Sequence, residues 1–142
     1  MADDKIIKVE CKIVRFNPEN NEVFRFNSGE IICAQNDVAV IYQFAGLIDN
    51  TLIKQVSELS IALSLFTKFE TKNKEVQKRL ENESLFIEEI ELSGQEAVIL
   101  WRIMKQLTEN PPKDNAGNTV IKFGLYHMRT INNFEKQIGE LK

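Results

Sequence analysis

A strand that runs straight into a capped helix is the feature that most constrains how this chain can fold. Residues 85–92 mix apolar side chains with glutamates, as a half-buried strand does. Ser93 and Glu96 then have the spacing of a capping box, in which each side chain satisfies the backbone N–H of the other residue. Apolar residues recur from 97 to 107, and the two prolines at 111 and 112 end the helix. Because the apolar face of this helix is too wide for one neighbour, we expect the helix to be central.

An earlier stretch of similar residue types indicates an internal duplication. Residues 30–42 match residues 89–101 in residue type at most positions, and a Thr-x-Ile-Lys sequence follows each stretch. A real duplication would be one strand–helix–loop–helix unit used twice, over residues 30–82 and 89–142. Identities are otherwise few, so chance similarity between two apolar helices is the alternative.

The N-terminal part of the chain predicts an antiparallel β-meander. Residues 5–16 alternate between apolar and charged side chains, which is typical of a strand with one face in water. Residues 22–27 and 30–34 are short strand candidates around Ser28-Gly29, which fits a tight hairpin. Residues 37–48 contain strand-forming side chains, but Asp37 as an N-cap and the duplication favour a helix there.

A long helix is predicted from residue 49 or 50 to residue 82. Charged residues crowd its second half, so we expect that end to project from the domain as an arm. The expected buried stripe recurs at alternating spacings of four and three and consists of Leu52, Val56, Leu59, Leu63 and Phe66.

The last helix, Val120–Leu141, has an unbroken seam at the same spacing. The residues of this seam are Val120, Gly124, His127, Ile131, Phe134, Ile138 and Leu141. The pattern is typical of a helix–helix contact, with Gly124 permitting close approach of a neighbour. The helix is therefore a candidate for forming a homo-oligomer, and packing on the core of its own chain is the alternative.

Composition predicts a soluble domain. With 142 residues, of which 43% are hydrophobic and 27% charged, the chain can form one α+β domain, an N-terminal antiparallel sheet carrying three or four helices. The net charge of −3 argues against general nucleic-acid binding, and no apolar run has membrane-spanning length. No export signal opens the chain, so we expect a cytoplasmic protein with reduced thiols at Cys11 and Cys33.

The residues that catalysis or metal binding would need are not paired in the sequence. A zinc site usually takes four Cys or His ligands at paired spacings, whereas this chain offers Cys11, Cys33 and His127. His127 is the sole histidine and lies among apolar positions, where a structural role is commoner than a catalytic one. The six glycines stand singly, without the clustering of a phosphate-binding loop. We therefore expect no enzyme activity, no metal site and no cofactor.

Charged segments are the remaining candidates for a functional site. The glutamates from residue 81 to residue 96 have no basic neighbour in the sequence, and basic residues gather on the long helix. A solvated surface is the ordinary explanation, and a surface that meets a basic groove on a partner is the functional one. The predicted partner-binding residues are Glu81, Glu83, Glu88, Glu89, Glu91, Lys72, Lys78 and Arg79.

The succession of a helix, a short loop, a Thr-x-Ile-Lys opening and a charged helix resembles small uncharacterised proteins encoded by bacteriophages. The resemblance implies a non-catalytic accessory protein that binds a host protein in the cytoplasm of the host bacterium. Inhibition of a host or defence protein is one role of that kind.

Two other functions fit the same sequence. One is a protein that sequesters a small ligand or nucleotide between subunits, in which Arg15, Arg25, Arg102 and Arg129 would contact an anion. The other is a structural component of a virion or of another assembly.

Overall fold

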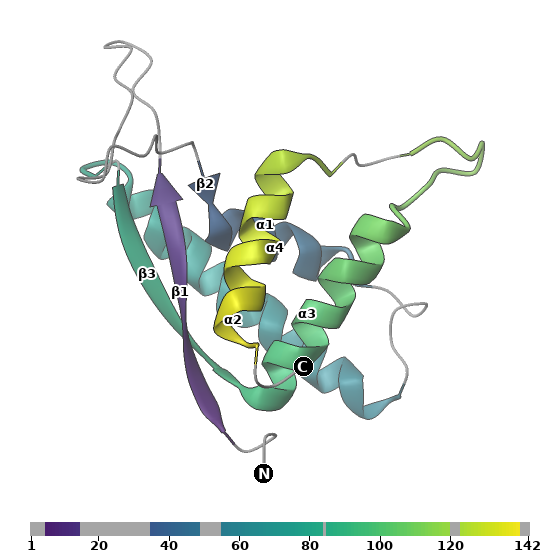
Figure 1. Ribbon diagram of the computed structural model, residues 1–142, viewed down its shortest axis with the longest axis horizontal. Coiled ribbons are helices and arrows are strands. Elements are labelled where there is room, and N and C mark those ends of the chain that lie inside the picture. Colours follow the sequence, from purple (N-terminus) through teal and green to yellow (C-terminus); the bar gives the residue numbers. More distant parts are fainter. Residues whose placement is uncertain (1–4, 15–34, 49–54, 84, 120–122, 140–142) are drawn as a thin grey trace.

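The computed structural model describes residues 5–14, 35–48, 55–83, 85–119 and 123–139. Within these residues the chain has an α+β fold, as predicted, in which the helices pack against a small antiparallel sheet (Figure 1). The predicted hairpin over residues 22–34 lies outside the described residues. The elements in chain order are β1 (Ile6–Val14), β2 (Gln35–Asn36), α1 (Asp37–Gly46), α2 (Ser57–Arg79), β3 (Leu85–Ser93), α3 (Gly94–Glu109) and α4 (Leu125–Gln137).

Strand β1 lies at the centre of the sheet. In the described part of the chain the strand order is β2-β1-β3, and both pairings are antiparallel. β3 pairs with β1 along its whole length, from Ser93 opposite Ile6 to Leu85 opposite Val14. The alternation predicted for β1 is confirmed, because the odd-numbered residues from 9 to 13 are buried whereas the even-numbered residues 6, 8 and 10 are exposed.

Helix α4 takes the place of a strand along the second edge of β1. The side-chain amide of Gln137 accepts the Glu10 N–H at 2.6 Å and donates to the Glu10 carbonyl at 2.8 Å. Asn133 donates to the same carbonyl at 3.0 Å. A residue of a neighbouring strand would make the same pair of bonds. β2 pairs with β1 at residues 13 and 14. Figure 1 shows α4 running beside β1, so α4 covers this edge of β1 at Glu10, beyond the part that pairs with β2.

A buried carboxylate joins α4 to the sheet and to α1. Asp37, the first residue of α1, is 1% exposed. Its two oxygens accept four hydrogen bonds of 2.7 to 2.8 Å, from the Lys12 N–H, the Gln35 amide, the Thr130 hydroxyl and the Asn133 amide. Since a buried charge is costly unless its oxygens are satisfied, these bonds fix how β1, β2, α1 and α4 meet. We call these five residues the Asp37 cluster.

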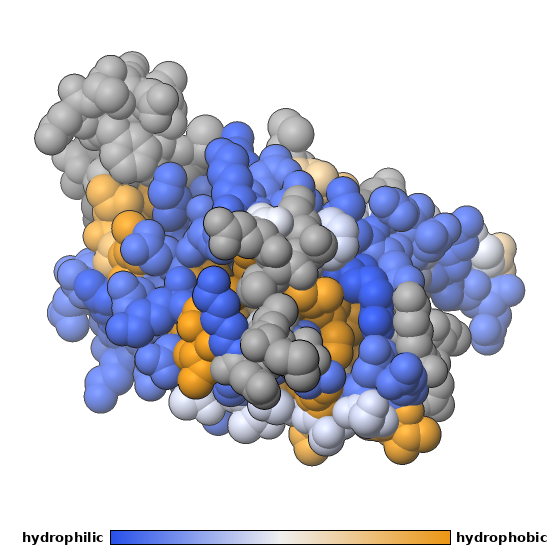
Figure 2. All heavy atoms as spheres, turned by 60° about the horizontal axis from the view of Figure 1, so that its bottom comes forward, coloured by the Kyte–Doolittle hydropathy of each residue, from blue (hydrophilic) through white to orange (hydrophobic). Residues whose placement is uncertain are grey.

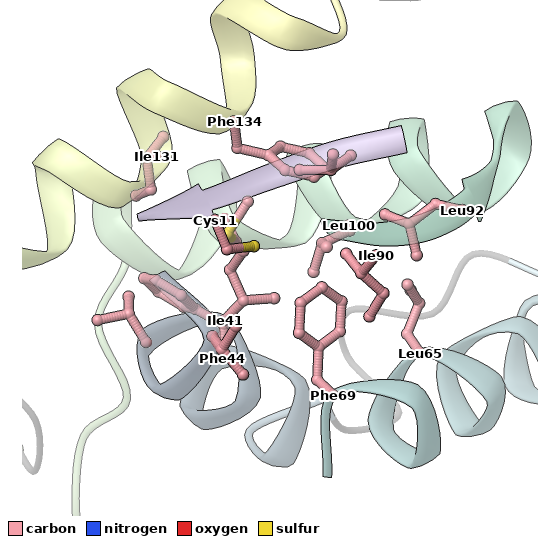
Figure 3. Packing of buried hydrophobic residues seen from close by; sticks show 14 of the residues in the cluster. Cys11, Ile41, Phe44, Leu65, Phe69, Ile90, Leu92, Leu100, Ile131 and Phe134 are labelled. Carbon is pink, nitrogen blue, oxygen red and sulfur yellow. The ribbon is translucent and has the colours of Figure 1, made fainter. Parts of the chain in front are cut away.

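One hydrophobic core lies between the sheet and the helices. Burial raises the pKa of the Cys11 thiol far above its usual range, so this buried free cysteine is an unreactive core residue. α3 is central, as predicted, because Leu100, Ile103 and Met104 are fully buried. Figure 3 shows side chains of the sheet and of each described helix meeting in one space: Cys11, Ile90, Leu92, Ile41, Phe44, Leu65, Phe69, Leu100, Ile131 and Phe134.

The starts of α1 and α3 follow the sequence, whereas the last helix, predicted from Val120, begins at Leu125 after the non-helical residues 123 and 124. The capping box is confirmed: the Glu96 N–H donates to Ser93 Oγ at 3.1 Å, and the Ser93 N–H donates to Glu96 Oε1 at 2.9 Å. α1 is a helix, as predicted, but Asp37 as its N-cap is wrong. Asn36 caps α1 by accepting the Ala39 N–H at 2.9 Å, because the Asp37 side chain turns into its buried cluster instead.

The face of α2 that enters the core is not the predicted one. Leu59 and Leu63, assigned to the buried stripe, are 48% and 66% exposed. The buried residues of α2 are Glu58, Ala62, Leu65, Phe69 and Val76. The predicted start at residue 49 or 50 is wrong, because residues 55 and 56 form a bend and a turn and α2 begins at Ser57.

The charged end of α2 is not a free arm, so that prediction is wrong. The guanidinium of Arg79 lies 4.2 Å from the centre of the Phe86 ring of β3, and Leu80 just beyond the helix is buried. A cation placed over an aromatic face is attracted to it, and the same side chain covers apolar surface with its methylene groups. This end of α2 therefore packs on the sheet.

Helix α4 buries its seam in the core of its own chain. Ile131, Phe134 and Ile138 are at most 1% exposed, so these residues are occupied within the chain. Gly124 precedes the helix, and nothing lies within 4 Å of the Cβ that another residue would carry there. Within the described chain no neighbouring helix approaches Gly124 closely, so a close contact there with another copy of the chain stays a prediction. Self-association through Val120–Leu141 stays a prediction.

The internal duplication also stays a prediction. α1 and α3 each follow a strand directly, but β2 has 2 residues where β3 has 9. Most of each Thr-x-Ile-Lys segment lies outside the described residues. The shared core nevertheless draws on elements from both proposed units, 30–82 and 89–142.

We expect Asp37→Asn to destabilise the fold by about 3 kcal/mol, because an amide keeps one acceptor oxygen and turns its NH₂ toward buried donors. Urea denaturation monitored by circular dichroism measures the change. Asp114→Asn is the matched control, since both bonds to that exposed side chain go to Oδ1 alone and an asparagine retains them. Equal midpoints for the two variants would contradict the role assigned to Asp37.

Candidate functional site

A groove lies between α2 and the β3 edge that faces away from β1. Its volume is about 620 Å³, within the range of clefts that hold ligands or peptide side chains. The residues that line it are Ser60, Leu63, Ser64, Thr67, Lys68, Thr71, Lys72, Ile90 and Glu91. We call this feature the α2–β3 groove. Figure 2 shows that apolar side chains reach the molecular surface in patches on an otherwise hydrophilic face.

The helix side of the groove is formed by short side chains. Ser60, Ser64, Thr67 and Thr71 follow one another at spacings of four and three, which places them on one face of α2. Leu63 lies beside them and is 66% exposed, while Ile90 of β3 forms apolar wall on the strand side. Short side chains on a helix leave room for another backbone to approach the neighbouring strand.

The edge of β3 beside the groove presents unpaired backbone groups, while the strand residues that line the groove itself are Ile90 and Glu91. In an antiparallel ladder, residues of alternate pairs direct their N–H and C=O groups away from the partner strand. The Gly94 N–H donates to the Lys5 carbonyl at 2.7 Å, so in this register the outward groups of β3 belong to residues 85, 87, 89 and 91. Lys68 Nζ donates to the Glu91 carbonyl at 3.2 Å. No other hydrogen bond to these outward groups is found in the described part of the chain.

Glu96 anchors α2 beside this edge. Its carboxylate accepts Lys68 Nζ at 2.7 Å, the Ser64 hydroxyl at 2.9 Å and the Ser93 N–H at 2.9 Å. Burial alone would raise the pKa of this carboxyl, but the hydrogen bonds from Lys68, Ser93 and Ser64 outweigh it and the pKa is lowered. Glu96, which completes the capping box of α3, therefore also holds Ser64 and Lys68 at one end of the groove.

The acidic segment is not the unpaired surface that the sequence predicted. Glu88, with a side chain 15% exposed, pairs with Arg79 at 2.9 Å and with Lys72 at 3.6 Å. Arg79 also pairs with Glu83, which lowers the pKa of that carboxyl, and Lys72 pairs with Glu75 at 3.0 Å. The cations that pair with Glu88 of β3 come from α2, which packs across the strand. A contact between segments that are separated in the sequence cannot be predicted from the residues next to Glu88.

Glu89 and Glu91 remain on the exposed outer face of β3. Glu91 lies opposite Lys8, an opposite-charge pair that stabilises a sheet, whereas Glu89 lies opposite Glu10, a like-charge pair that destabilises it. Within the described residues no hydrogen bond or ion pair of the Glu89 carboxylate is found. Glu81 and Lys78 are exposed near the turn between α2 and β3. The structure thus brings Lys72, Arg79, Glu83 and Glu88 together and leaves Glu89 free.

Among the other predicted site residues, Arg102 has a structural partner. Arg102 forms two hydrogen bonds with Glu58, at 3.0 and 2.8 Å, so its guanidinium is occupied. Arg129 lines a separate pocket, and Arg15, Arg25 and Cys33 lie outside the described residues. Among the residues described, no three His, Cys, Asp or Glu side chains form a cluster suited to a metal ion. No described helix combines the length and the apolarity needed to cross a membrane.

His127 has a packed, hydrogen-bonded environment. Its Nδ1 accepts the Gly124 N–H at 3.1 Å, and its Nε2 lies 3.2 Å from Gln43 Oε1. The ring meets Phe123 and Phe44 edge-on at centre distances of 5.1 and 6.2 Å. Burial lowers the pKa of this imidazole below its ordinary value of 6.5. These contacts stabilise the start of α4.

The α2–β3 groove was not predicted from the sequence, because the apolar residues on that face of α2 have the same spacing as residues buried in a core. Leu59 and Leu63 match the helical spacing of buried residues, and so does the set that is buried. The serines and threonines at four–three spacing were the available sign that this face of α2 is not packed against its own chain.

No protein-family model, curated protein or solved structure matches this chain significantly. Functional inference therefore depends on the residues and geometry described above.

Neighbouring charge reversals on β3 should have opposite consequences. Glu88→Lys replaces a half-buried partner of two cations, so we expect a loss of about 2 kcal/mol in the free energy of unfolding. Glu89→Lys relieves a like-charge contact with Glu10 and should change stability by at most about 0.5 kcal/mol. Urea denaturation of both variants tests the comparison, and equal losses would show that the pairing of Glu88 is unimportant.

The lowered pKa of His127 predicts a specific pH dependence. Because the unfolded chain binds the proton more tightly, the free energy of unfolding should be greatest above pH 6.5 and decrease as the pH falls below that value. Denaturation from pH 5 to pH 8 measures this slope, and the Glu96 carboxyl titrates below the range because its pKa is lowered from 4.5. In His127→Gln the slope should become shallower. An unchanged slope would exclude His127 as its source.

Proposed function

We propose that this protein is a non-catalytic binding protein that adds an extended segment of a partner protein to the free edge of β3. The observation that carries the proposal is the row of outward backbone groups at residues 85, 87 and 89, beside a groove on α2. An unpaired strand edge is a template for a further strand, and main-chain hydrogen bonds then supply much of the affinity.

The two faces of the added strand would meet different chemistry. Successive side chains of a strand point to opposite faces, so alternate residues of the partner would face α2 and the outer face of the sheet. On the α2 side they would meet Leu63, Ile90 and the short hydroxyl side chains. On the outer side they would meet Glu89, whose carboxylate already faces Glu10.

These faces define the preferred partner segment as alternating basic and apolar residues. A lysine or arginine opposite Glu89 would offset the like-charge contact with Glu10, and an apolar residue would cover Leu63. The charged site predicted from the sequence is thereby narrowed to Glu89, Glu91 and the backbone between them. That the partner is a host protein, and that binding inhibits it, stays a prediction from the bacteriophage resemblance.

A designed peptide can stand in for the partner segment in a test of the proposal. The probe is a capped octapeptide that alternates valine and lysine, titrated into ¹⁵N-labelled protein and followed by NMR. We expect the amide signals of Ile87, Glu89 and Glu91 to shift, since these N–H groups face the open edge. A valine–glutamate octapeptide should bind at least tenfold more weakly.

Two matched pairs of variants make the result specific. Glu89→Lys should weaken the valine–lysine peptide about three- to tenfold, while Glu109→Lys, an equal charge change on the exposed end of α3, should not. Leu63→Ser should weaken binding more than Leu59→Ser, because both leucines are exposed but Leu63 alone of the two lines the groove. Shifts confined to another surface, or equal losses in the controls, would reject strand addition at β3.

A further inference from the structure

A second, polar pocket lies where α4 runs beside β1 and β2. Its volume is about 250 Å³, and its lining contains cationic and amide side chains but no carboxylate: Lys12, Gln35, Arg129, Asn132, Asn133 and Lys136. Arg129 and Lys136 form no hydrogen bond or ion pair with the rest of the described chain. Two cations that have no partner within the described residues thus face a concave surface.

The shape of this pocket is set by the Asp37 cluster. Gln35 and Asn133 both donate to the Asp37 carboxylate, at 2.7 and 2.8 Å, which holds the two amides in place. Arg129 and Lys136 lie seven residues apart, two turns along the same face of α4. A site whose polar groups are already positioned loses less conformational entropy when a ligand binds.

The local charge favours an anion. Arg129 and Lys136 bring two positive charges to the lining, none of the six lining residues is acidic, and Gln35 and Asn133 of the lining bond the carboxylate of Asp37. That carboxylate is buried and already accepts four hydrogen bonds, so its negative charge is stabilised by those donors. Glu10 precedes Lys12 on the same outer face of β1 and is exposed to solvent, which screens it.

We propose that this pocket binds the phosphate group of a small phosphomonoester. The guanidinium of Arg129 and the ammonium of Lys136 suit the several oxygens and near-double negative charge of a phosphomonoester better than they suit a single carboxylate. At about 250 Å³ the pocket is smaller than most sites that enclose a whole drug-sized ligand, so it fits the anionic head group. The site lies on the opposite edge of the sheet from the α2–β3 groove and is independent of the function proposed there.

Ribose 5-phosphate and ribose form the test pair, each titrated into ¹⁵N-labelled protein at low ionic strength. Ribose 5-phosphate should shift the amide signals of α4 around Arg129 to Lys136, and those of Lys12 and Gln35, whereas ribose should shift none. Inorganic phosphate is the third probe and should bind at the same residues at least threefold more weakly. Tighter binding of inorganic phosphate than of ribose 5-phosphate would overturn the phosphomonoester assignment.

Charge-neutralising variants distinguish a site from general attraction. Arg129→Gln and Lys136→Gln should each weaken ribose 5-phosphate binding at least fivefold, and the double variant should abolish it. The control is Lys74→Gln with Lys113→Gln, two exposed lysines on other surfaces, which removes the same charge and should leave the affinity within twofold. Both double variants should melt like the parent protein. Undiminished binding in the Arg129/Lys136 double variant, or an equal loss in the control, would overturn the proposal.

Discussion

The four hydrogen bonds accepted by the Asp37 carboxylate are the interaction on which the arrangement of this fold depends. They come from the backbone of β1, a side chain of β2 and two side chains of α4, and they converge on the first residue of α1. Hydrophobic burial drives these elements together but does not fix their direction, since apolar contacts are not directional. A buried charge with specified donors does fix it, because any other arrangement leaves the carboxylate or a donor unsatisfied.

Features determined by neighbours in sequence could be predicted. The alternation of β1, the strand at β3 and the Ser93–Glu96 capping box each depend on a few consecutive residues, and each is present. The ambiguous segment after residue 36 is also a helix, although its cap is Asn36. Local chemistry of this kind is largely independent of the tertiary fold.

Features determined by contacts between distant segments could not be predicted. Two helical stripes of α2 satisfy the spacing rule, and the contact with the sheet selects the one that contains Leu65 and Phe69. The acidic residues of β3 look unpaired because their cations belong to α2, which crosses them in space. The candidate groove was hidden for the same reason, since one wall is helix and the other is a strand edge.

The amide pairing between α4 and β1 has a consequence for the order of folding. Gln137 and Glu10 are separated by 127 positions, so the second edge of β1 is covered by residues near the opposite end of the sequence. Such a long-range closure costs chain entropy before it returns any stabilisation, and contacts of this type slow folding. During synthesis β1 leaves the ribosome long before α4 exists. Until α4 arrives, that edge of β1 is open to pairing with other chains, and the nascent protein is most vulnerable to misassembly in this interval.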